Sequence, residues 1–303
     1  MEKILEVRNL HKAYGNFVAL KNISFSVEYG KIVGLLGKNG AGKTTLIKTI
    51  IGLFKNYDGE IIYRGKPINF NDPLEMSTIG VLVDTVFHED LSAYANLKLL
   101  MMATPNKDLT YMDREIMDLL KLVGLENNAR DKVKTFSFGM KQRLALSQAL
   151  ISEPNLLILD EPFVGLDPLG IELVKEKLLT LCSEKKVSII FSSHQLSDVA
   201  EISDDIIVID KGIIKYAGSY SELANTGKKY CITLKSVLKE DELVLFNKYE
   251  ISKNNDMIMI DYNSDLLNEV IKLLHDKDYK IDYIDIKENS LIKLFREQVS
   301  TDE

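Results

Sequence analysis

Nine residues, GKNGAGKTT at positions 37–45, have the composition and spacing of a loop that binds phosphate groups. They match the pattern G-x-x-x-x-G-K-[ST] between an apolar run and a run with helical character. The glycines would let successive backbone N–H groups surround a phosphate chain, because a Cβ would block that approach. The Lys43 ammonium would then contact the outer phosphates, and the Thr44 hydroxyl would bind Mg²⁺. This pattern predicts a site for a nucleoside phosphate.

Two adjacent carboxylates, Asp160 and Glu161, directly follow the apolar run LLIL at 156–159. At the carboxyl end of a buried strand, in a chain with a phosphate loop, Asp160 would hold Mg²⁺ through water. Glu161 would orient or deprotonate an attacking water molecule. A solvated acidic turn is the alternative interpretation. Together with the phosphate loop, the pair indicates hydrolysis of a nucleoside triphosphate.

Two further segments carry groups suited to the end of a phosphate chain. Ser137 and Gly139 begin a helical run that extends to Ala149, where a hydroxyl and free backbone N–H groups favour anions. His194 follows the strand-like run VSIIFSS and would hydrogen-bond a γ-phosphate or the attacking water. Taken alone, the first segment could also be a serine-capped helix start, and the histidine a packed or surface residue.

Five short apolar runs must supply the strands that position these groups. Several lack polar alternation, which predicts strands buried on both faces in a mainly parallel sheet covered by helices, an α/β architecture. Two other runs, Ile4–Arg8 and Ile23–Val27, alternate with period two and predict antiparallel strands with one solvated face. The five buried runs are Lys31–Leu36, Ile79–Val83, Leu156–Leu159, Val187–Phe191 and Ile206–Ile209.

A change in composition divides the 303 residues into two domains, the number expected at roughly 150 residues per domain. All six prolines lie at or before Pro168, and the last glycine is Gly227. We therefore expect domains at 1–227 and 228–303. The second has the pattern βαββαβ plus a helix, compatible with a ferredoxin-like α+β fold. Its predicted elements are strand 229–235, helix 240–247, strands 248–252 and 256–262, helix 264–276, strand 279–286 and helix 288–298.

Composition argues against several classes of protein. With 38 basic and 45 acidic residues the net charge is −7, which disfavours an all-basic nucleic-acid-binding protein. No apolar run approaches the roughly 18 to 20 residues that span a bilayer, and the N-terminus lacks a secretory signal pattern. Cys182 and Cys231 lie outside any CxxC or metal-ligand spacing, so we expect both to be buried in a protein of a reducing cytoplasm.

The order of the motifs over residues 4–221 resembles that of the ATP-binding-cassette (ABC) ATPases. FSFGMKQR at 136–143, just before LLILDEP, is similar to the family's signature and Walker B region. The resemblance implies an α/β fold with a parallel-sheet P-loop core, an antiparallel β subdomain and a helical subdomain, followed here by a small α+β domain. It also implies ATP and Mg²⁺ as cofactors, and ATP hydrolysis as the activity.

The resemblance gives roles to residues along the whole cassette. Tyr14 in KAYGNFVAL matches the aromatic residue that stacks on adenine, while Asp160 and Glu161 match the Walker B aspartate and the catalytic glutamate. The signature region contains Ser137, Gly139 and Gln142, the D-loop contains Gly165-Leu166-Asp167, and His194 matches the switch histidine. The Walker A residues are Gly37, Lys38, Asn39, Gly40, Ala41, Gly42, Lys43, Thr44 and Thr45.

This sequence departs from the usual ABC ATPase motifs at several positions, and these departures resemble the motifs of one branch of the family. The usual LSGGQ is FSFGM here, with Phe138 and Met140 in place of a glycine and the glutamine. Asp84 stands where the family usually has a metal-contacting glutamine; it is shorter and cannot donate when ionised, and it is kept as a candidate metal ligand. These departures, the SxGMKQR wording and the extra domain resemble the bacitracin-resistance and lantibiotic-immunity type of ABC ATPase.

The resemblance also implies partners. Each nucleotide would lie between the Walker A of one subunit and the signature of the other, in a homodimer or in a heterodimer with a second ABC ATPase. A separately encoded transmembrane permease would meet residues 85–110 and hold the chain at the cytoplasmic, inner face of the cell membrane. No nucleic-acid partner is expected. The apolar stripe with Met101 and Met102 in this segment also fits an ordinary core-facing helix.

Two other functions compete with this interpretation. A soluble ABC-type ATPase for translation would carry two phosphate loops, and one for DNA repair would carry long coiled coils between Walker A and the signature. This chain has one loop, and only about 90 residues without sustained heptads intervene. A regulatory module that binds ATP without turnover would not need Glu161. We therefore expect the ATP-hydrolysing subunit of a bacterial ABC exporter for peptide antibiotics or other peptides.

Overall fold

The computed structural model describes residues 2–225 and 228–287. The chain divides into two compact units, Met1–Gly218 and Ser219–Glu303, and each is described by itself. This division lies before the domain boundary that the sequence predicts at Gly227. Gly227 itself and the predicted helix 288–298 lie outside the described residues.

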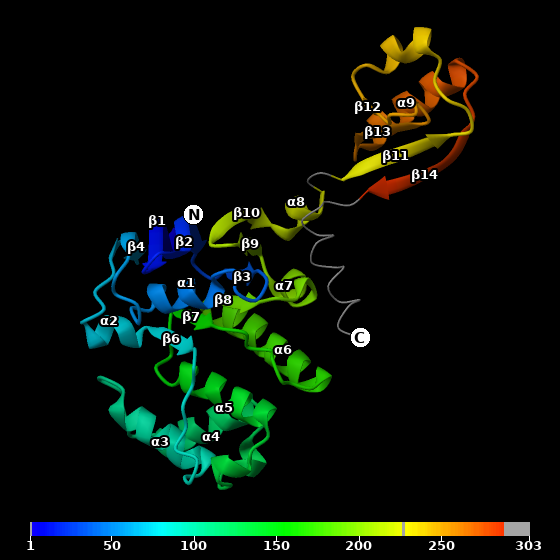
Figure 1. Ribbon diagram of the computed structural model, residues 1–303. Helices are drawn as coiled ribbons and strands as arrows, with labels where there is room; N and C mark the ends of the chain where they lie inside the picture. The colour runs from blue at the N-terminus through cyan, green and yellow to red at the C-terminus, as the bar shows by residue number, and fades with distance from the viewer. Residues whose placement is uncertain (1, 226–227, 288–303) are drawn as a thin grey trace. The chain divides into compact units, whose positions relative to one another are not determined.

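A six-stranded sheet in the order β10-β9-β3-β8-β7-β6 forms the centre of the first unit (Figure 1). The strands from β9 to β6 pair in parallel, and every residue of β3, β7 and β8 is buried. The predicted parallel sheet with strands buried on both faces is therefore confirmed. The strands are β3 Ile32–Leu36, β6 Ile79–Leu82, β7 Leu156–Leu159, β8 Ser188–Ser193, β9 Asp205–Asp210 and β10 Ile213–Ser219.

A second, antiparallel sheet in the order β2-β1-β4-β5 contains the strands predicted at Ile4–Arg8 and Ile23–Val27. Along β1 and β2 buried side chains alternate with more exposed ones, as period-two patterning predicts. Leu5 of this sheet, Leu46 of helix α1 and Leu35 of β3 belong to one hydrophobic cluster, so α1 links the two sheets. The strands are β1 Lys3–Tyr14, β2 Phe17–Glu28, β4 Asp58–Tyr63 and β5 Lys66–Pro67.

Helices α3, α4 and α5 contact one another and form a helical subdomain (Figure 1). The side chains of Ser92 and Ser137 accept hydrogen bonds from backbone N–H groups at the starts of α3 and α5, which fixes where these helices begin. Met101 is fully buried whereas Met102 is 58% exposed, so the methionine stripe divides into a core residue and a surface residue. The helices of the unit are α1 Lys43–Ile50, α2 Pro73–Ser77, α3 Ala93–Ala103, α4 Met112–Leu122, α5 Phe138–Leu150, α6 Pro168–Lys185 and α7 Leu196–Ile202, with 3₁₀ helices η1 Glu126–Asn128 and η2 Val133–Thr135.

The second unit contains an antiparallel sheet in the order β12-β13-β11-β14 with its own hydrophobic cluster. Ile232, Ile258 and Phe246 in that cluster are fully buried. Helix α9 has the predicted bounds, and its start is capped by the Asn263 side chain; the predicted helix 240–247 is a 3₁₀ helix instead. The elements are α8 Tyr220–Asn225, β11 Lys229–Leu234, η3 Glu240–Phe246, β12 Glu250–Ile251, β13 Met257–Asp261, α9 Ser264–Asp276 and β14 Ile281–Lys287.

Both cysteines are buried free thiols, as predicted from their isolated positions. Burial raises the pKa of the Cys182 thiol, so the neutral and unreactive form is favoured at neutral pH. None of the helices within 2–225 and 228–287 is both long and apolar enough to span a membrane.

Candidate functional site

The predicted phosphate loop joins the end of β3 to the start of α1. Gly40 and Gly42 have φ angles of +80° and +109°, a region that L side chains rarely adopt. A Cβ on Gly37 would lie 2.6 Å from the Ile209 carbonyl oxygen, so this glycine is required by close packing instead. Ala41 is buried at the base of the loop. A cavity of about 560 Å³ opens over it, and its lining includes Lys38, Asn39, Gly40, Gly42, Lys43, Thr44, Thr45 and Glu161.

Lys43, the first residue of α1, is 5% exposed and its ammonium is directed across this loop. Its Nζ donates to the Gly37 carbonyl oxygen at 2.6 Å and lies 3.1 Å from Glu161 Oε1. A lysine held in this way by its own loop loses little side-chain entropy on meeting a phosphate. Glu161 Oε1 is buried and has no hydrogen-bond partner within the described residues, its lysine contact apart. An incoming water would donate to Glu161 Oε1, and a polyphosphate oxygen would accept from the Lys43 ammonium.

The two candidate metal ligands with the best geometry are Thr44 and Asp160. Thr44 Oγ1 donates to Asp160 Oδ2 at 2.7 Å, so the hydroxyl and carboxylate oxygens are adjacent. Mg²⁺ prefers one or two protein oxygens and completes its octahedron with water and phosphate oxygens. The described residues contain no cluster of three or more His, Cys, Asp or Glu that could hold a metal by themselves. The donor set therefore fits a nucleotide-bound Mg²⁺.

Ser192 at the end of β8 is a functional residue that the sequence reasoning missed. Its hydroxyl donates to Asp160 Oδ1 at 2.6 Å and accepts from the Glu161 N–H at 2.8 Å. Glu161 has a φ of +48°, and such strain persists at a non-glycine residue only where its surroundings fix it. Two serines at the end of the apolar run VSIIFSS were the available signal. Ser192 thus fixes both acidic residues.

His194 lies beside Glu161, as the predicted shared site requires. Its Nδ1 is 2.9 Å from Glu161 Oε2. Since an ionised carboxylate can only accept, Nδ1 donates this hydrogen bond, and Nε2 is left for a second partner. The His194 side chain is 40% exposed, so a ligand can reach that nitrogen.

The structure places Tyr14 in an aromatic cluster outside the residues that line the loop cavity. Its ring meets the Phe54 ring edge-on with centroids 5.8 Å apart, and Lys12 Nζ lies 5.2 Å from its centroid. Phe17 pairs with Tyr14 across the β1–β2 hairpin, is 66% exposed and lines the cavity. The sequence reasoning missed Phe17, although the aromatic residue next to the turn was visible. Adenine stacking by Tyr14 stays a prediction.

The signature residues lie at the start of α5 and outside the lining of the loop cavity. Ser137 Oγ accepts from the Met140 N–H at 3.2 Å, and a Cβ on Gly139 would lie 2.9 Å from the Gly165 carbonyl oxygen. Gln142 Nε2 donates to the Glu161 carbonyl oxygen at 3.1 Å, which joins α5 to the acidic pair.

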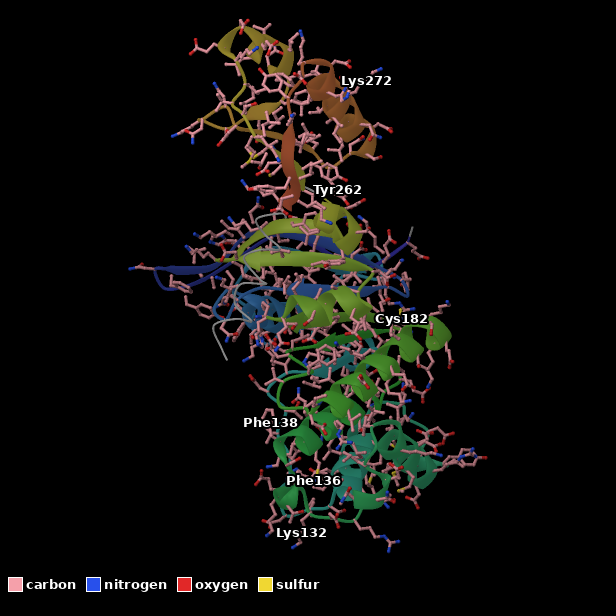
Figure 2. All side chains as sticks on the ribbon, turned by 90° about the vertical axis from the view of Figure 1, so that its right-hand side faces the viewer. Lys132, Phe136, Phe138, Cys182, Tyr262 and Lys272 are labelled. Carbon is pink, nitrogen blue, oxygen red and sulfur yellow. The ribbon has the colours of Figure 1, made fainter. Side chains whose placement is uncertain are left out.

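Phe138, which replaces a usual glycine of the signature, is 62% exposed at the surface of the helical subdomain (Figure 2). Its ring occupies the position that a Cβ on Gly165 would need, 2.0 Å from the nearest ring carbon. The signature start and the D-loop are therefore packed on each other within one chain. Asp167 in the same loop caps α6, because its Oδ1 accepts from the Gly170 N–H at 3.0 Å.

Asp84 is paired with Lys48 of α1 rather than with Thr44 or Asp160. The carboxylate is 71% exposed, and the residue has a φ of +44°. The structure thus brings Lys43, Thr44, Asp160, Glu161 and His194 together. Asp84 lines a neighbouring cavity of about 660 Å³ together with Asp160 and Glu161, and its carboxylate contacts Lys48. Metal binding by Asp84 stays a prediction.

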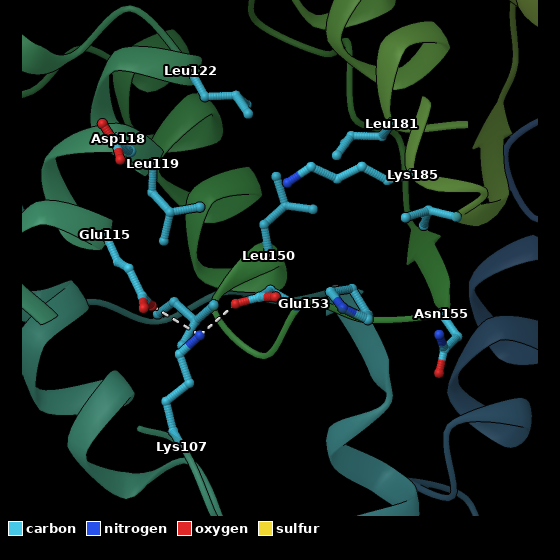
Figure 3. A pocket seen from close by; sticks show the side chains of 13 residues that line it. Lys107, Glu115, Asp118, Leu119, Leu122, Leu150, Glu153, Asn155, Leu181 and Lys185 are labelled. Carbon is cyan, nitrogen blue, oxygen red and sulfur yellow. Dashed lines mark hydrogen bonds and ion pairs between the residues drawn. The ribbon is translucent and has the colours of Figure 1, made fainter. Parts of the chain in front are cut away.

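A second cavity, of about 370 Å³, lies between α4, the end of α5 and the end of α6 (Figure 3). Lys107 spans one side of it, with Nζ 2.8 Å from Glu115 Oε2 and 2.7 Å from Glu153 Oε1. Leu150 and Lys185 lie on other sides (Figure 3). None of the residues predicted to act on nucleotide lines this cavity.

Comparison with known proteins gives consistent matches. Residues 20–164 match the ABC transporter family model. The chain is 34% identical to an uncharacterized ABC transporter ATP-binding protein, YdbJ, of Bacillus subtilis (strain 168), over 92% of this chain and 90% of the relative. It is 37% identical to the bacitracin transport ATP-binding protein BcrA of Enterococcus faecalis, over 76% and 74%. Among solved structures, cbiO1 from Clostridium perfringens, part of an ABC transporter complex, matches with a TM-score of 0.64 and 30% identity over 74% of this chain and 91% of that one.

Proposed function

The chain belongs to the ATP-binding subunits of ABC transporters, which hydrolyse ATP, and from this premise we propose that it powers a bacterial exporter of peptide antibiotics or other peptides. The bacitracin transport relative supports this substrate class. The convergence of Lys43, Thr44, Asp160, Glu161 and His194 at the end of the parallel sheet is the observation that carries the catalytic part.

Each of these residues has one task in hydrolysis. Lys43 and the backbone N–H groups of its loop bind and orient the terminal phosphates of ATP. Thr44 and Asp160 hold Mg²⁺, which when bound neutralises charge on the phosphate oxygens. Glu161 accepts a proton from the attacking water, and His194 holds that water or the γ-phosphate through Nε2. Ser192 keeps the two carboxylates in place.

We further propose that the active form is a dimer with two composite sites. Ser137 and Gly139 lie outside the lining of their own loop cavity, so their hydroxyl and N–H groups are available to a nucleotide held by another subunit. A two-fold arrangement of identical chains would complete both sites. A heterodimer with a second ABC ATPase would do the same.

The membrane part of the proposal rests on the segment that follows Asp84. Val86 is 86% exposed and Leu100 40% exposed, and both line a groove of about 660 Å³ beside the end of β6. A separately encoded permease that seats a short helix there would bury apolar surface and hold the chain at the inner face of the membrane. Such a contact also lies close to Asp84, which lines the same groove.

The test measures ATP binding and membrane association separately. Lys43→Ala should abolish ATP binding, because the contact of the ammonium with the phosphates and its hydrogen bonds are lost together. The control, Lys66→Ala at an exposed position, should bind ATP like the parent. In cells that co-express a candidate permease, the tagged chain should purify with membranes and confer bacitracin tolerance that Glu161→Gln removes. Parent-like affinity in Lys43→Ala contradicts the nucleotide site. Tolerance unchanged by Glu161→Gln contradicts export, and a soluble ATPase or a regulatory module would then be favoured.

A further inference from the structure

A charged cluster of Lys175, Asp198 and Glu201 joins helices α6 and α7, which Figure 1 labels. Lys175 Nζ is 3.1 Å from Asp198 Oδ1 and 2.6 Å from Glu201 Oε2. The side chains of Lys175 and Asp198 are only 9% and 10% exposed, whereas that of Glu201 is 59% exposed. None of the three lines the nucleotide cavity.

Burying such a pair is costly, so its presence calls for a physical reason. Removing an ammonium and a carboxylate from water costs several kcal/mol each, and a well-packed apolar pair is often as stable. Burial alone would lower the pKa of Lys175, but the hydrogen bonds to Glu201 and Asp198 outweigh it and raise that pKa. The ammonium is therefore charged at neutral pH, and Asp198 has a fixed cation beside it.

Asp198 extends from this cluster to the backbone around His194. The Ser193 hydroxyl donates to Asp198 Oδ2 at 3.3 Å, with the Gln195 carbonyl oxygen as a second acceptor at 3.3 Å, and accepts from the Gln195 N–H at 3.0 Å. Ser193 and Gln195 are the residues on either side of His194 in the chain. The turn that carries the imidazole is therefore hydrogen-bonded to the buried carboxylate through one hydroxyl.

Lys175 extends from the same cluster to the segment after Glu161. Its Nζ lies 5.5 Å from the centroid of the Phe163 ring, a cation–π contact two residues beyond Glu161. Phe163 also meets Phe191 of β8 edge-on, with centroids 5.5 Å apart. The Lys175 ammonium thus contacts Asp198, which lies beside the His194 turn, and Phe163, which lies in the segment after Glu161.

We propose that Lys175 and Asp198 are positioning residues for hydrolysis: they set the geometry in which His194 Nδ1 meets Glu161 without touching the nucleotide. This inference rests on the proposed roles of Glu161 and His194. It explains why a charged pair, rather than an apolar one, occupies this place. A salt bridge is directional through its hydrogen bonds, whereas apolar contacts would let the histidine turn relax.

The experiment uses steady-state ATP hydrolysis and ATP binding by the full chain. Asp198→Asn keeps the shape and removes the charge, Ser193→Ala removes only the connecting hydroxyl, and Lys175→Met keeps the length of the side chain. Each should lower kcat about 10- to 100-fold, the loss expected for a displacement of about 1 Å in a catalytic group. The KM for ATP and the affinity for ATP should stay within about twofold of the parent, because the phosphate loop is untouched.

The matched control is Glu201→Gln, which removes the charge of the exposed partner of Lys175 but leaves the hydrogen bonds around His194. It should keep the parental kcat. If Lys175→Met does not fold, the two milder variants decide. A parental kcat in folded Asp198→Asn and Ser193→Ala overturns the proposal, as does an equal loss in Glu201→Gln. Failure of the proposed function is recognised separately, since Lys43→Ala or Glu161→Gln would then hydrolyse ATP like the parent.

Discussion

Glu161 is held by four different groups, which is unusual for a residue that must act on water. Lys43 and His194 meet its carboxylate, Ser192 receives its N–H and Gln142 donates to its carbonyl oxygen. Contacts to both carboxylate oxygens fix the rotamer before ATP arrives, and the backbone contacts maintain the positive φ. Little reorganisation is then needed to align this carboxylate with a water molecule.

The first prediction concerns the chemical role of this carboxylate. Glu161→Gln keeps the shape but removes the ability to accept a proton, so hydrolysis should slow by about 10² to 10⁴ while ATP still binds. The ATP-bound dimer should last longer, because it no longer decays through chemistry. Turnover and dimer lifetime, by mass measurement with ATP, check both points. Glu172→Gln, an exposed change on α6, is the control; parental turnover in Glu161→Gln would show that another group is the base.

The second prediction separates the two interpretations of Asp84. If its carboxylate binds Mg²⁺, Asp84→Asn should raise the Mg²⁺ concentration for half-maximal hydrolysis several-fold, and Lys48→Met should not. If the contact with Lys48 is its main role, the two variants should behave alike and leave that concentration unchanged. The sequence predicts the first result, and the contact of the carboxylate with Lys48 favours the second. A Mg²⁺ titration of both variants distinguishes the cases.

Among the elements, the loop between α3 and α4 contains Lys107, which forms ion pairs with α4 and with the loop that precedes β7. The Lys107 side chain is 12% exposed and pairs with Glu115 on α4 and with Glu153 in the loop between α5 and β7 (Figure 3). Its hydrogen bond lowers the pKa of Glu153. Since Asp160 and Glu161 directly follow β7, this ion pair connects the placement of α4 with the strand that leads to the carboxylates.

The third prediction is that Lys107→Met destabilises this junction. Tm should fall by about 2 to 4 °C, the shift that roughly 1 kcal/mol causes in a unit of this size. A carboxyl with a lowered folded-state pKa stabilises the protein above its unfolded pKa and loses that effect as pH falls through the folded value. The difference from the parent should therefore shrink below about pH 4.5, the ordinary pKa of glutamate. Thermal unfolding over pH checks this, with the exposed Lys66→Met as control; a difference that persists in acid would contradict it.

At the scale of the whole molecule, the residues assigned to ATP all belong to the first unit, and the second unit has a hydrophobic cluster of its own. Every residue assigned to ATP lies between Tyr14 and His194, within the first unit. The second unit has its own cluster around Ile232, Phe246 and Ile258. Within the described residues, the two hydrophobic clusters share no member.

The fourth prediction is that a chain ending at Gly227 folds and binds ATP with parental affinity. The effect of removing residues 228–303 should appear in dimer lifetime or in coupling to the permease, because the residues that line the loop cavity lie between Phe17 and Gly212. ATP titration and mass measurement with ATP, on both chains, test this. A truncated chain that aggregates or ignores ATP would mean that residues 228–303 complete the first core.

The sequence alone determined what depends on spacing along the chain. The phosphate loop, the strands without polar alternation, and the bounds of α9 all follow from residue types within a short window, because backbone conformation and strand burial are local demands. The order of the motifs along the chain also predicted that Lys43, Asp160, Glu161 and His194 lie in one site. Parallel strands end at one edge of a sheet, so residues that follow them must meet.

Only the tertiary structure decided which side chains pair across that edge. The Thr44–Asp160 hydrogen bond joins residues 116 positions apart, and Ser192 reaches Asp160 over 32 positions. Spacing cannot reveal such partners, because loop lengths and helix packing set them. The same reason explains why Phe17 rather than Tyr14 lines the cavity, and why the metal candidate Asp84 is held by Lys48.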